Sequence, residues 1–332
     1  MPPLYVVQQG AKLRIRNHRL IVVYENQVLT SLPVNHVSQV VLCGNIGLTT
    51  PAITTLLLRS IEVVFLGIDG KYRGRLVAPV TPHVPLRRSQ YRALDNHPFT
   101  FELAKHFVSA KLQHQRALLA RHNRERSLPE IRACISQLTT AINTVPRKAN
   151  LHSLNGVEGS AGASYFRGLK HLFASEWHFE KRNRRPPKDP VNVLLSLGYT
   201  LLSQVAFGAV STVGLDPYAG FMHQIVYNRP ALALDLMEEF RPVVDGIVLW
   251  CMNSGSITPQ HFEEGNEKYP VLLQDEGKRR FLQAFEERFS SRFTHPVRRE
   301  RLTLRQCILE QARQLAQCIR QEDPHYIGMG FR

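Results

Sequence analysis

The sequence has few cysteines, and no secretory or membrane-spanning segment is expected in it. Its five cysteines are scattered and form no Cys-x-x-Cys pair, which argues against a disulfide framework and a structural zinc site. The first seven residues carry neither the basic start nor the apolar run of a secretory signal. No hydrophobic stretch is expected to approach the roughly 20 apolar residues of a membrane span. These absences predict a protein of the reducing cytoplasm with no membrane partner.

Acidic residues are also scarce. The chain has 42 Lys and Arg against 27 Asp and Glu, a net charge of +15, which is typical of a protein that approaches polyphosphate. A charged coat or contact with an anionic membrane surface are the alternatives. The charge is uneven, however: residues 87–126 hold nine bases and three acids, whereas residues 235–276 hold nine acids and two bases. Nucleic acid is therefore the expected partner.

The first 80 residues have the pattern of a β domain. With 332 residues, of which 43% are hydrophobic, the chain is long enough for about two domains with cores of their own. Short β-branched runs alternate with turn residues, which predicts a small, mostly antiparallel β domain over 1–80. One helix, 50–59, is expected to interrupt it. The predicted strands are 4–8, 12–16, 19–24, 27–32, 37–43, 62–66 and 73–78.

The character of the sequence changes after residue 80. Prolines punctuate the next segment, and a linker is expected over 81–100. Beyond it the apolar residues recur with helical spacing, so residues 101–332 are expected to form a larger, all-α domain. The predicted fold class is therefore α+β. The expected helices are roughly 101–126, 130–143, 160–181, 190–212, 231–240, 242–252, 276–290 and 302–320.

Three side chains in this second domain, Glu158, His223 and Glu238, each lie in a distinctive local sequence. Glu158 stands between two glycines, in a segment that is expected to begin as a flexible turn and end as a helix. His223 follows an Asp-Pro-Tyr-Ala-Gly turn. Each also has an ordinary structural explanation. A glutamate between glycines can be a turn carboxylate, and a single histidine can be a hydrogen-bonded structural residue. An acidic residue on an amphipathic helix can belong to its solvent-exposed face. Their joint occurrence on a basic chain points instead to metal-assisted phosphodiester chemistry on DNA.

The metal expected at such a site is Mg²⁺ or Mn²⁺. Asp235 and Glu238 are three residues apart and share a face of the predicted helix. Two carboxylates and one imidazole suit an ion that favours oxygen ligands and tolerates one nitrogen, whereas zinc would recruit Cys or a second His. Glu239 directly follows Glu238, and spacing alone does not choose between them.

Residues 181–188 form the densest basic cluster in the chain, and such a cluster neutralises phosphates without reading bases. A nuclear-localisation signal is a weaker alternative, because the cluster lies between two predicted helices. Asp189 and Pro190 are typical of a helix cap and a first helical residue, so Asp189 is expected to be structural. The candidate DNA-binding residues are Arg182, Arg184, Arg185, Lys188 and Arg229.

Several motifs together resemble one known family, the CRISPR-associated integrase of spacer acquisition, which is the first of the numbered Cas proteins. The resemblance spans nearly the whole chain, and its last two motifs are highly specific. The motifs are Leu-Cys-Gly-Asn at 42–45, Thr-Thr-Pro-Ala at 49–52, Gly-Arg-Leu-Val at 74–77, Arg-Arg-Ser-Gln-Tyr at 87–91, Gly-Val-Glu-Gly at 156–159, Asp-Pro-Val-Asn at 189–192, Leu-Leu-Ser-Leu-Gly-Tyr at 194–199, 216–223 and 232–242.

By this resemblance the family's metal ligands fall on Glu158, His223 and Glu238, with Asp235 as an accessory carboxylate. The family's pattern thus favours Glu238 over its neighbour. Asn228 stands where a glycine is common and Ala231 where a serine is common, but both departures concern a turn and leave the ligands intact.

The resemblance also implies a reaction and partners. The 3′-hydroxyl of a captured DNA fragment would attack a phosphodiester at a CRISPR repeat boundary, and the same site could nick DNA with water. The β domain would form a homodimer, and two dimers would flank a dimer of the small second numbered Cas protein. The alternatives are a stand-alone or transposon-encoded nuclease or integrase, and a DNA-binding scaffold whose metal site is inert.

Overall fold

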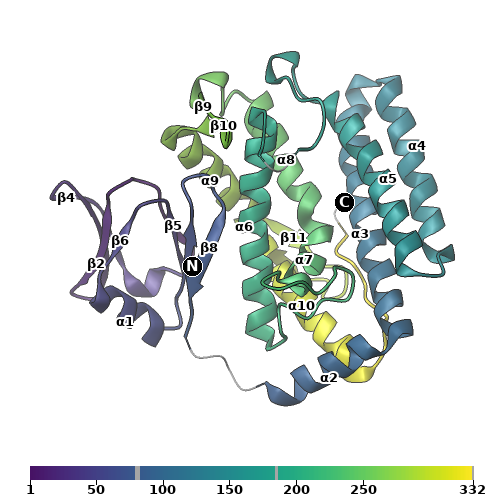
Figure 1. Cartoon of the computed structure of the whole chain (residues 1–332), viewed down its shortest axis with the longest axis horizontal. Helices are drawn as coiled ribbons and strands as arrows, with labels where there is room; N and C mark the ends of the chain where they lie inside the picture. Colours follow the sequence, from purple (N-terminus) through teal and green to yellow (C-terminus); the bar gives the residue numbers. More distant parts are fainter. Residues whose placement is uncertain (79–82, 184–185, 331–332) are drawn as a thin grey trace. The chain divides into compact units, whose positions relative to one another are not determined.

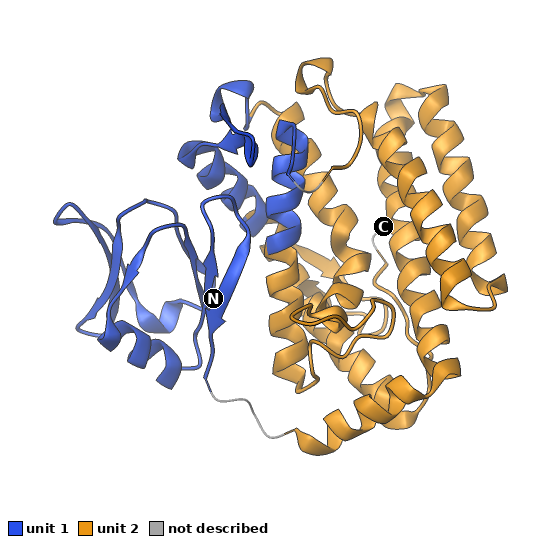
Figure 2. Ribbon diagram, in the orientation of Figure 1, with its two compact units in different colours: residues 1–81, 184–200, 256–286 blue, residues 82–183, 201–255, 287–332 orange. Residues whose placement is uncertain are grey.

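This computed structural model describes residues 1–78, 83–183 and 186–330, and its contacts divide the chain into two compact units (Figure 2). An N-terminal sheet region is followed by mostly helical structure, so the predicted α+β class is confirmed. The division differs from the expected boundary near residue 80, because two later segments join the N-terminal region. Unit 1 comprises Met1–Thr81, Arg184–Thr200 and Ser256–Glu286, and unit 2 comprises Pro82–Asn183, Leu201–Gly255 and Glu287–Arg332.

Unit 1 contains two four-stranded sheets (Figure 1). The first has the order β1 (Leu4–Val6), β5 (Gln39–Cys43), β7 (Glu62–Leu66), β8 (Tyr72–Leu76). The second has the order β4 (Gln27–Pro33), β3 (Arg19–Tyr24), β2 (Lys12–Arg16), β6 (Gly47–Leu48). The strands β1 and β7 both run parallel to β5, and β6 runs parallel to β2. The expectation of a mostly antiparallel domain holds in part, because three of the six pairings in these two sheets are antiparallel and three are parallel. Helix α1 (Thr50–Leu58) lies between β5 and β7 in sequence and supplies the long connection that parallel strands require.

The two sheets and α1 share one hydrophobic core. Alternate residues of the strands point inward, as the exposed–buried pattern of β2 shows. Leu13 of β2, Leu20 of β3 and Val40 of β5 are fully buried in the same cluster as Leu56 of α1 and Val63 of β7. The hairpin β9 (Phe262–Asn266) and β10 (Tyr269–Leu273), which the sequence did not predict, also belongs to unit 1.

Helix α6 (Pro190–Val213) corrects one expectation from the sequence. By length and composition alone it could cross a membrane, so the expectation that no stretch approaches a membrane span is wrong. Within the protein, however, 61% of its most apolar stretch is buried, and Leu194, Leu195 and Leu202 are fully covered. A helix that is apolar on most sides is the kind that packs within a protein core. Its N-terminus is capped as predicted, because Asp189 Oδ1 accepts a hydrogen bond from Asn192 N.

Unit 2 is built on three long helices that pack on one another: α3 (His97–Arg126), α4 (Pro129–Thr144) and α5 (Leu151–Lys170). Asn96 caps α3 by accepting a hydrogen bond from Phe99 N, and Ser127 ends it in the left-handed conformation. The remaining helices of the unit include α2 (Val84–Asp95), α7 (Ala231–Met237), α8 (Arg241–Asn253) and α10 (Leu304–Gln321). Figure 1 shows α3, α4 and α5 side by side.

Two helices of unit 2 differ from the sequence-based prediction. Most of the expected linker over 81–100 is helical, because α2 occupies Val84–Asp95. The expected turn at 155–159 is wrong, because α5 begins at Leu151 and continues through both glycines that flank Glu158. Asn150 caps α5, and burial of apolar residues such as Leu154 and Tyr165 outweighs the cost of about 1 kcal/mol for each glycine in a helix.

Candidate active site

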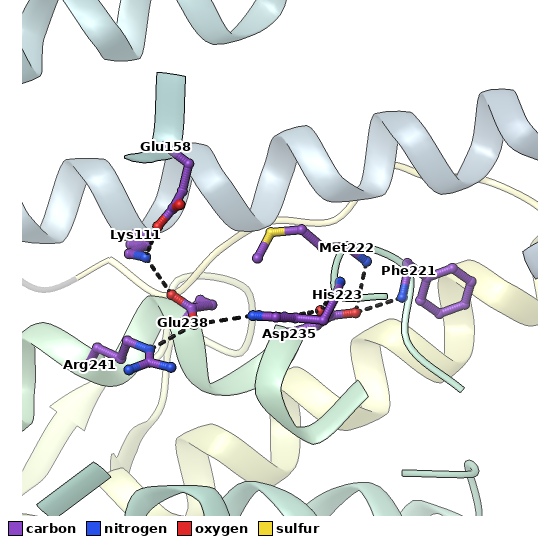
Figure 3. Close-up of polar contacts among 8 residues, drawn as sticks. All are labelled: Lys111, Glu158, Phe221, Met222, His223, Asp235, Glu238 and Arg241. Carbon is purple, nitrogen blue, oxygen red and sulfur yellow. Dashed lines mark hydrogen bonds and ion pairs between the residues drawn. The ribbon is translucent and has the colours of Figure 1, made fainter. Parts of the chain in front are cut away.

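The candidate site lies within unit 2 and collects polar side chains from four segments of that unit (Figure 3). Helix α3 contributes Lys111 and α5 contributes Glu158. The loop before α7 contributes His223, and the short 3-10 turn η4 (Glu238–Phe240), which continues α7, contributes Glu238. Because α3 and α5 pack together and η4 packs against α3, residues distant in sequence meet at one place.

Lys111 joins the two carboxylates that the sequence singled out. Its Nζ contacts Glu158 Oε1 and lies 2.6 Å from Glu238 Oε2. The other oxygen of Glu238 accepts a hydrogen bond of 2.7 Å from Arg241 Nε. Burial by itself raises the pKa of Glu238, but the charges of Arg241, Lys111 and His223 outweigh it and hold that pKa well below its usual range. Glu238 is therefore a buried, ionised carboxylate.

Asp235 orients the histidine. Its buried carboxylate accepts hydrogen bonds from the backbone N of Phe221 at 2.6 Å, Met222 at 3.0 Å and His223 at 2.9 Å. It also lies 2.7 Å from His223 Nδ1. This contact fixes the orientation of the imidazole ring, and His223 Nε2 lies 3.8 Å from Glu238 Oε1. Asp235 thus contacts the ring nitrogen that is remote from Glu238 and orients the imidazole, as carboxylate partners of metal-binding histidines do.

The loop that carries His223 needs a glycine at position 220. A Cβ atom there would lie 2.6 Å from the carbonyl carbon of Ala231 and 2.8 Å from Asp235 Oδ2. Only glycine permits this approach of the loop to the start of α7. The tight turn in turn allows Asp235 to reach the three successive backbone N–H groups.

Glu239, the alternative that spacing left open, faces different surroundings. Its carboxylate accepts hydrogen bonds from Tyr326 Oη, from Met329 N at 2.7 Å and from Gln311 Nε2 at 3.2 Å. Burial raises the pKa of Glu239 to about 7, against the opposing effect of these hydrogen bonds. Glu239 therefore ties the C-terminal segment to η4, whereas Glu238 faces Lys111 and His223.

The side chains of the site are of the chemical kinds that bind a divalent ion, but they are not arranged as a complete set of metal ligands. Among the residues that the structure describes, no group of three or more His, Cys, Asp or Glu side chains is arranged to hold a metal. A cation nonetheless stands between Glu158 and Glu238, namely the Lys111 ammonium. These two carboxylates, with His223 Nε2 3.8 Å from Glu238, are donors of the kinds that Mg²⁺ and Mn²⁺ accept.

The glycines near Glu158 in α5 have open space beside them. A Cβ atom added at Gly156, Gly159 or Gly162 would meet no atom within 4 Å, so the glycines are not required for helix packing. Glu158 itself is 28% exposed, against 3% for Glu238. Its carboxylate is thus the more accessible of the two.

The predicted DNA-binding residues are not gathered at this site by any described contact. Lys188 is exposed, while Arg182 and Arg229 are half-buried. Arg182 Nη1 donates to Asn183 O. The remaining two, Arg184 and Arg185, lie outside the described residues.

Two residues of the site, Lys111 and Arg241, were missed by the reasoning from sequence. Arg241 lies three residues after Glu238, a spacing that favours an ion pair on a helix. Lys111 occupies a buried position between two other buried residues, Ala110 and Leu112. A lysine at such a position of a helical pattern is the one signal that could have identified it, because lysine is rarely buried without a partner.

Comparison with known proteins identifies the family. Residues 4–287 match the family model described as CRISPR associated protein Cas1. The chain belongs to the Cas1 family. The family resemblance inferred from the sequence motifs is thereby confirmed.

Individual relatives and solved structures agree with the match. The chain is 40% identical over 297 residues to CRISPR-associated endonuclease Cas1 1 of Thermus thermophilus, which covers 89% of each sequence. A chain of a solved Cas6-RT-Cas1–Cas2 complex has a TM-score of 0.86 and 28% identity, with 99% of this chain and 36% of that chain covered. A casposase bound to integration product shares the fold, with a TM-score of 0.85, 22% identity and coverage of 97% and 91%.

Proposed function

We propose that this Cas1-family chain is a metal-dependent DNA integrase and endonuclease that inserts captured DNA fragments into a CRISPR array. The observation that carries this proposal is that one cation, Lys111, joins Glu158 and Glu238, and that His223 Nε2 lies 3.8 Å from Glu238. The name of the Thermus thermophilus relative, an endonuclease, supports it. In the reaction, a 3′-hydroxyl of the fragment loses its proton and its oxygen bonds to the phosphorus at the repeat boundary. The bond from that phosphorus to the 3′-oxygen of the repeat strand breaks, and the departing oxygen takes up a proton.

The roles of the residues follow from their contacts. Glu158, His223 and Glu238 would hold Mg²⁺ or Mn²⁺, whose chemistry is to polarise the phosphoryl oxygen and to make the attacking hydroxyl more acidic. Asp235 keeps Nε2 of His223 directed toward Glu238. Arg241 keeps Glu238 ionised in its buried position. The site therefore holds two carboxylates beside a cation position, which Lys111 occupies in this structure.

The proposed partners are DNA, a second copy of this chain and a small Cas2 protein. The similar chain in the solved Cas6-RT-Cas1–Cas2 complex supports the Cas2 partner. Pairing of two copies through the β domain is supported by β4, an edge strand whose Val28 and Leu29 are 56% and 49% exposed. Exposed apolar residues on an edge strand are suited to a protein contact. Because a CRISPR array is chromosomal DNA, the proposed reaction takes place in the cytoplasm.

The metal requirement provides the test of this function. The chain, purified with its Cas2 partner, is expected to insert a labelled DNA fragment into a repeat-containing target with Mg²⁺ or Mn²⁺. Insertion is expected to cease with a chelator, while thermal unfolding remains cooperative, because the sequence has no Cys-x-x-Cys pair of the kind that predicts a structural zinc site. Undiminished insertion in chelator would contradict the proposal, and metal-dependent nicking without insertion would favour a stand-alone nuclease.

The basic segment at 181–188 is expected to contribute to DNA affinity by neutralising phosphates. Replacing Arg182, Arg184 and Arg185 with alanine should weaken binding to all DNA sequences alike. The slope of log affinity against log salt should flatten by roughly one unit for each phosphate that the variant no longer neutralises. Fluorescence anisotropy over a range of salt concentrations measures both effects. The control replaces the three exposed bases of β2 (Lys12–Arg16), which lowers the net charge by the same amount. Equal salt slopes for the two variants would show that residues 181–188 make no specific contribution to DNA binding.

A further inference from the structure

Lys111 is a buried cation whose position requires explanation. Its side chain is 10% exposed, and it extends from the middle of α3, where neighbouring positions carry buried apolar residues. Removing a lysine ammonium from water is unfavourable unless ionised partners compensate. Here the partners are the two carboxylates of Glu158 and Glu238.

The two carboxylates differ in how far they depend on Lys111. Glu238 also has Arg241 as a partner. For Glu158, in contrast, Lys111 is the one cation within ion-pair distance in the described part of the chain. Without Lys111, the negative charge of Glu158 would face that of Glu238 across a partly buried space, where repulsion between like charges is strong.

From this geometry we infer that Lys111 is the resident counter-ion of the metal site, and that it exchanges places with the divalent ion. This inference rests on the metal-dependent function proposed above. When no metal is bound, the ammonium holds the two carboxylates in position. When a divalent ion enters, the flexible four-carbon stem of lysine lets the ammonium withdraw while α3 stays in place. Lys111 is thus a positioning residue that also competes with the metal.

The exchange has a consequence for metal affinity that a purely structural lysine would not have. Because entry of the ion requires displacement of a positive charge, Lys111→Met is expected to bind Mn²⁺ more tightly than the wild type, by roughly tenfold or more. Lys111→Arg keeps the charge and is expected to stay near the wild-type affinity. The matched control is Lys105→Met, which removes a lysine from the same helix whose partner is Glu102. Isothermal titration calorimetry with Mn²⁺ measures all four proteins.

Thermal unfolding gives a second measurement that does not involve activity. In chelator, Lys111→Met leaves two carboxylates without their shared cation, so its unfolding midpoint is expected to fall below that of Lys105→Met. Saturating Mn²⁺ is expected to raise the midpoint of Lys111→Met by more than it raises that of the wild type. In the double variant Lys111→Met with Glu158→Gln, the uncompensated charge is gone, and the metal-free midpoint is expected to recover.

The outcomes separate this inference from the proposed function. Wild-type binding of Mn²⁺ with no gain in affinity for Lys111→Met would overturn the exchange and leave the metal function standing. No Mn²⁺ binding by the wild type or by Lys111→Met would overturn the metal function, and the exchange with it. If Lys111→Met does not fold in chelator, recovery in the double variant supports the inference, and failure to recover contradicts it.

Discussion

Replacing Glu158 or His223 with alanine is expected to abolish strand transfer of a labelled DNA fragment while DNA binding stays within a few-fold. Glu158 contacts the cation position that Lys111 occupies, and His223 lies beside Glu238, so each change removes a proposed metal ligand. Loss of metal-assisted charge stabilisation is worth several kcal/mol, which corresponds to a rate loss of roughly 10³-fold or more. A gel assay of half-site integration at fixed Mg²⁺, together with a filter-binding assay, measures the two effects.

The control for this experiment is Glu125→Ala, which removes an exposed carboxylate near the end of α3. It is expected to retain wild-type integration. Full activity in Glu158→Ala or His223→Ala would show that the metal ligands lie elsewhere. Loss of DNA binding in parallel with activity would instead point to a collapsed fold, which thermal unfolding of the same proteins would reveal.

The second large effect is expected from Glu238→Gln, which should eliminate nearly all integration. Glutamine keeps the size of the side chain and removes the charge that a divalent ion requires. It also removes the charge that compensates Lys111 and Arg241. Because both cations then remain in a buried site without this partner, thermal stability in chelator is also expected to fall.

The neighbouring carboxylates provide internal controls for Glu238. Asp235→Asn is expected to reduce integration by roughly 10- to 100-fold, because Asp235 orients His223 from behind. Glu239→Gln is expected to have a mild effect on integration, because its carboxylate contacts Tyr326 and Met329 on another side of η4. Half-site integration with Mg²⁺ and again with Mn²⁺ measures the series. If Glu239→Gln proves the most damaging, the assignment of the metal ligand is displaced by one residue.

Local sequence predicted the N-terminal strands well where their pairing partners are close in the chain. The bounds of β2 and β3 agree with the predicted 12–16 and 19–24. Asn17 and His18, both with positive φ, close the two-residue turn between them, and such a turn determines the register of a hairpin. The pairing of β5 with β1 and β7 was not predictable in this way, because parallel partners are brought together by connections whose path the local pattern does not specify.

The helical region shows the same limit. Glycine on both sides of Glu158 favours a turn by intrinsic propensity, yet the segment is helical because Leu154, Ala161 and Tyr165 are buried by neighbouring elements. Helix α6 is long and apolar enough to cross a bilayer, and only its burial distinguishes it as a core helix. In both places the deciding energy comes from tertiary packing.

Composition and local motifs were sufficient to predict the α+β class, the basic character of the chain, its family and the three residues proposed as metal ligands. Tertiary packing, in contrast, was needed to show that Glu238 and Glu239 face different surroundings and that Lys111 stands between Glu158 and Glu238. An ion pair between residues on α3, α5 and η4 forms only where those elements pack. No pattern along the chain specifies which charges that packing brings together.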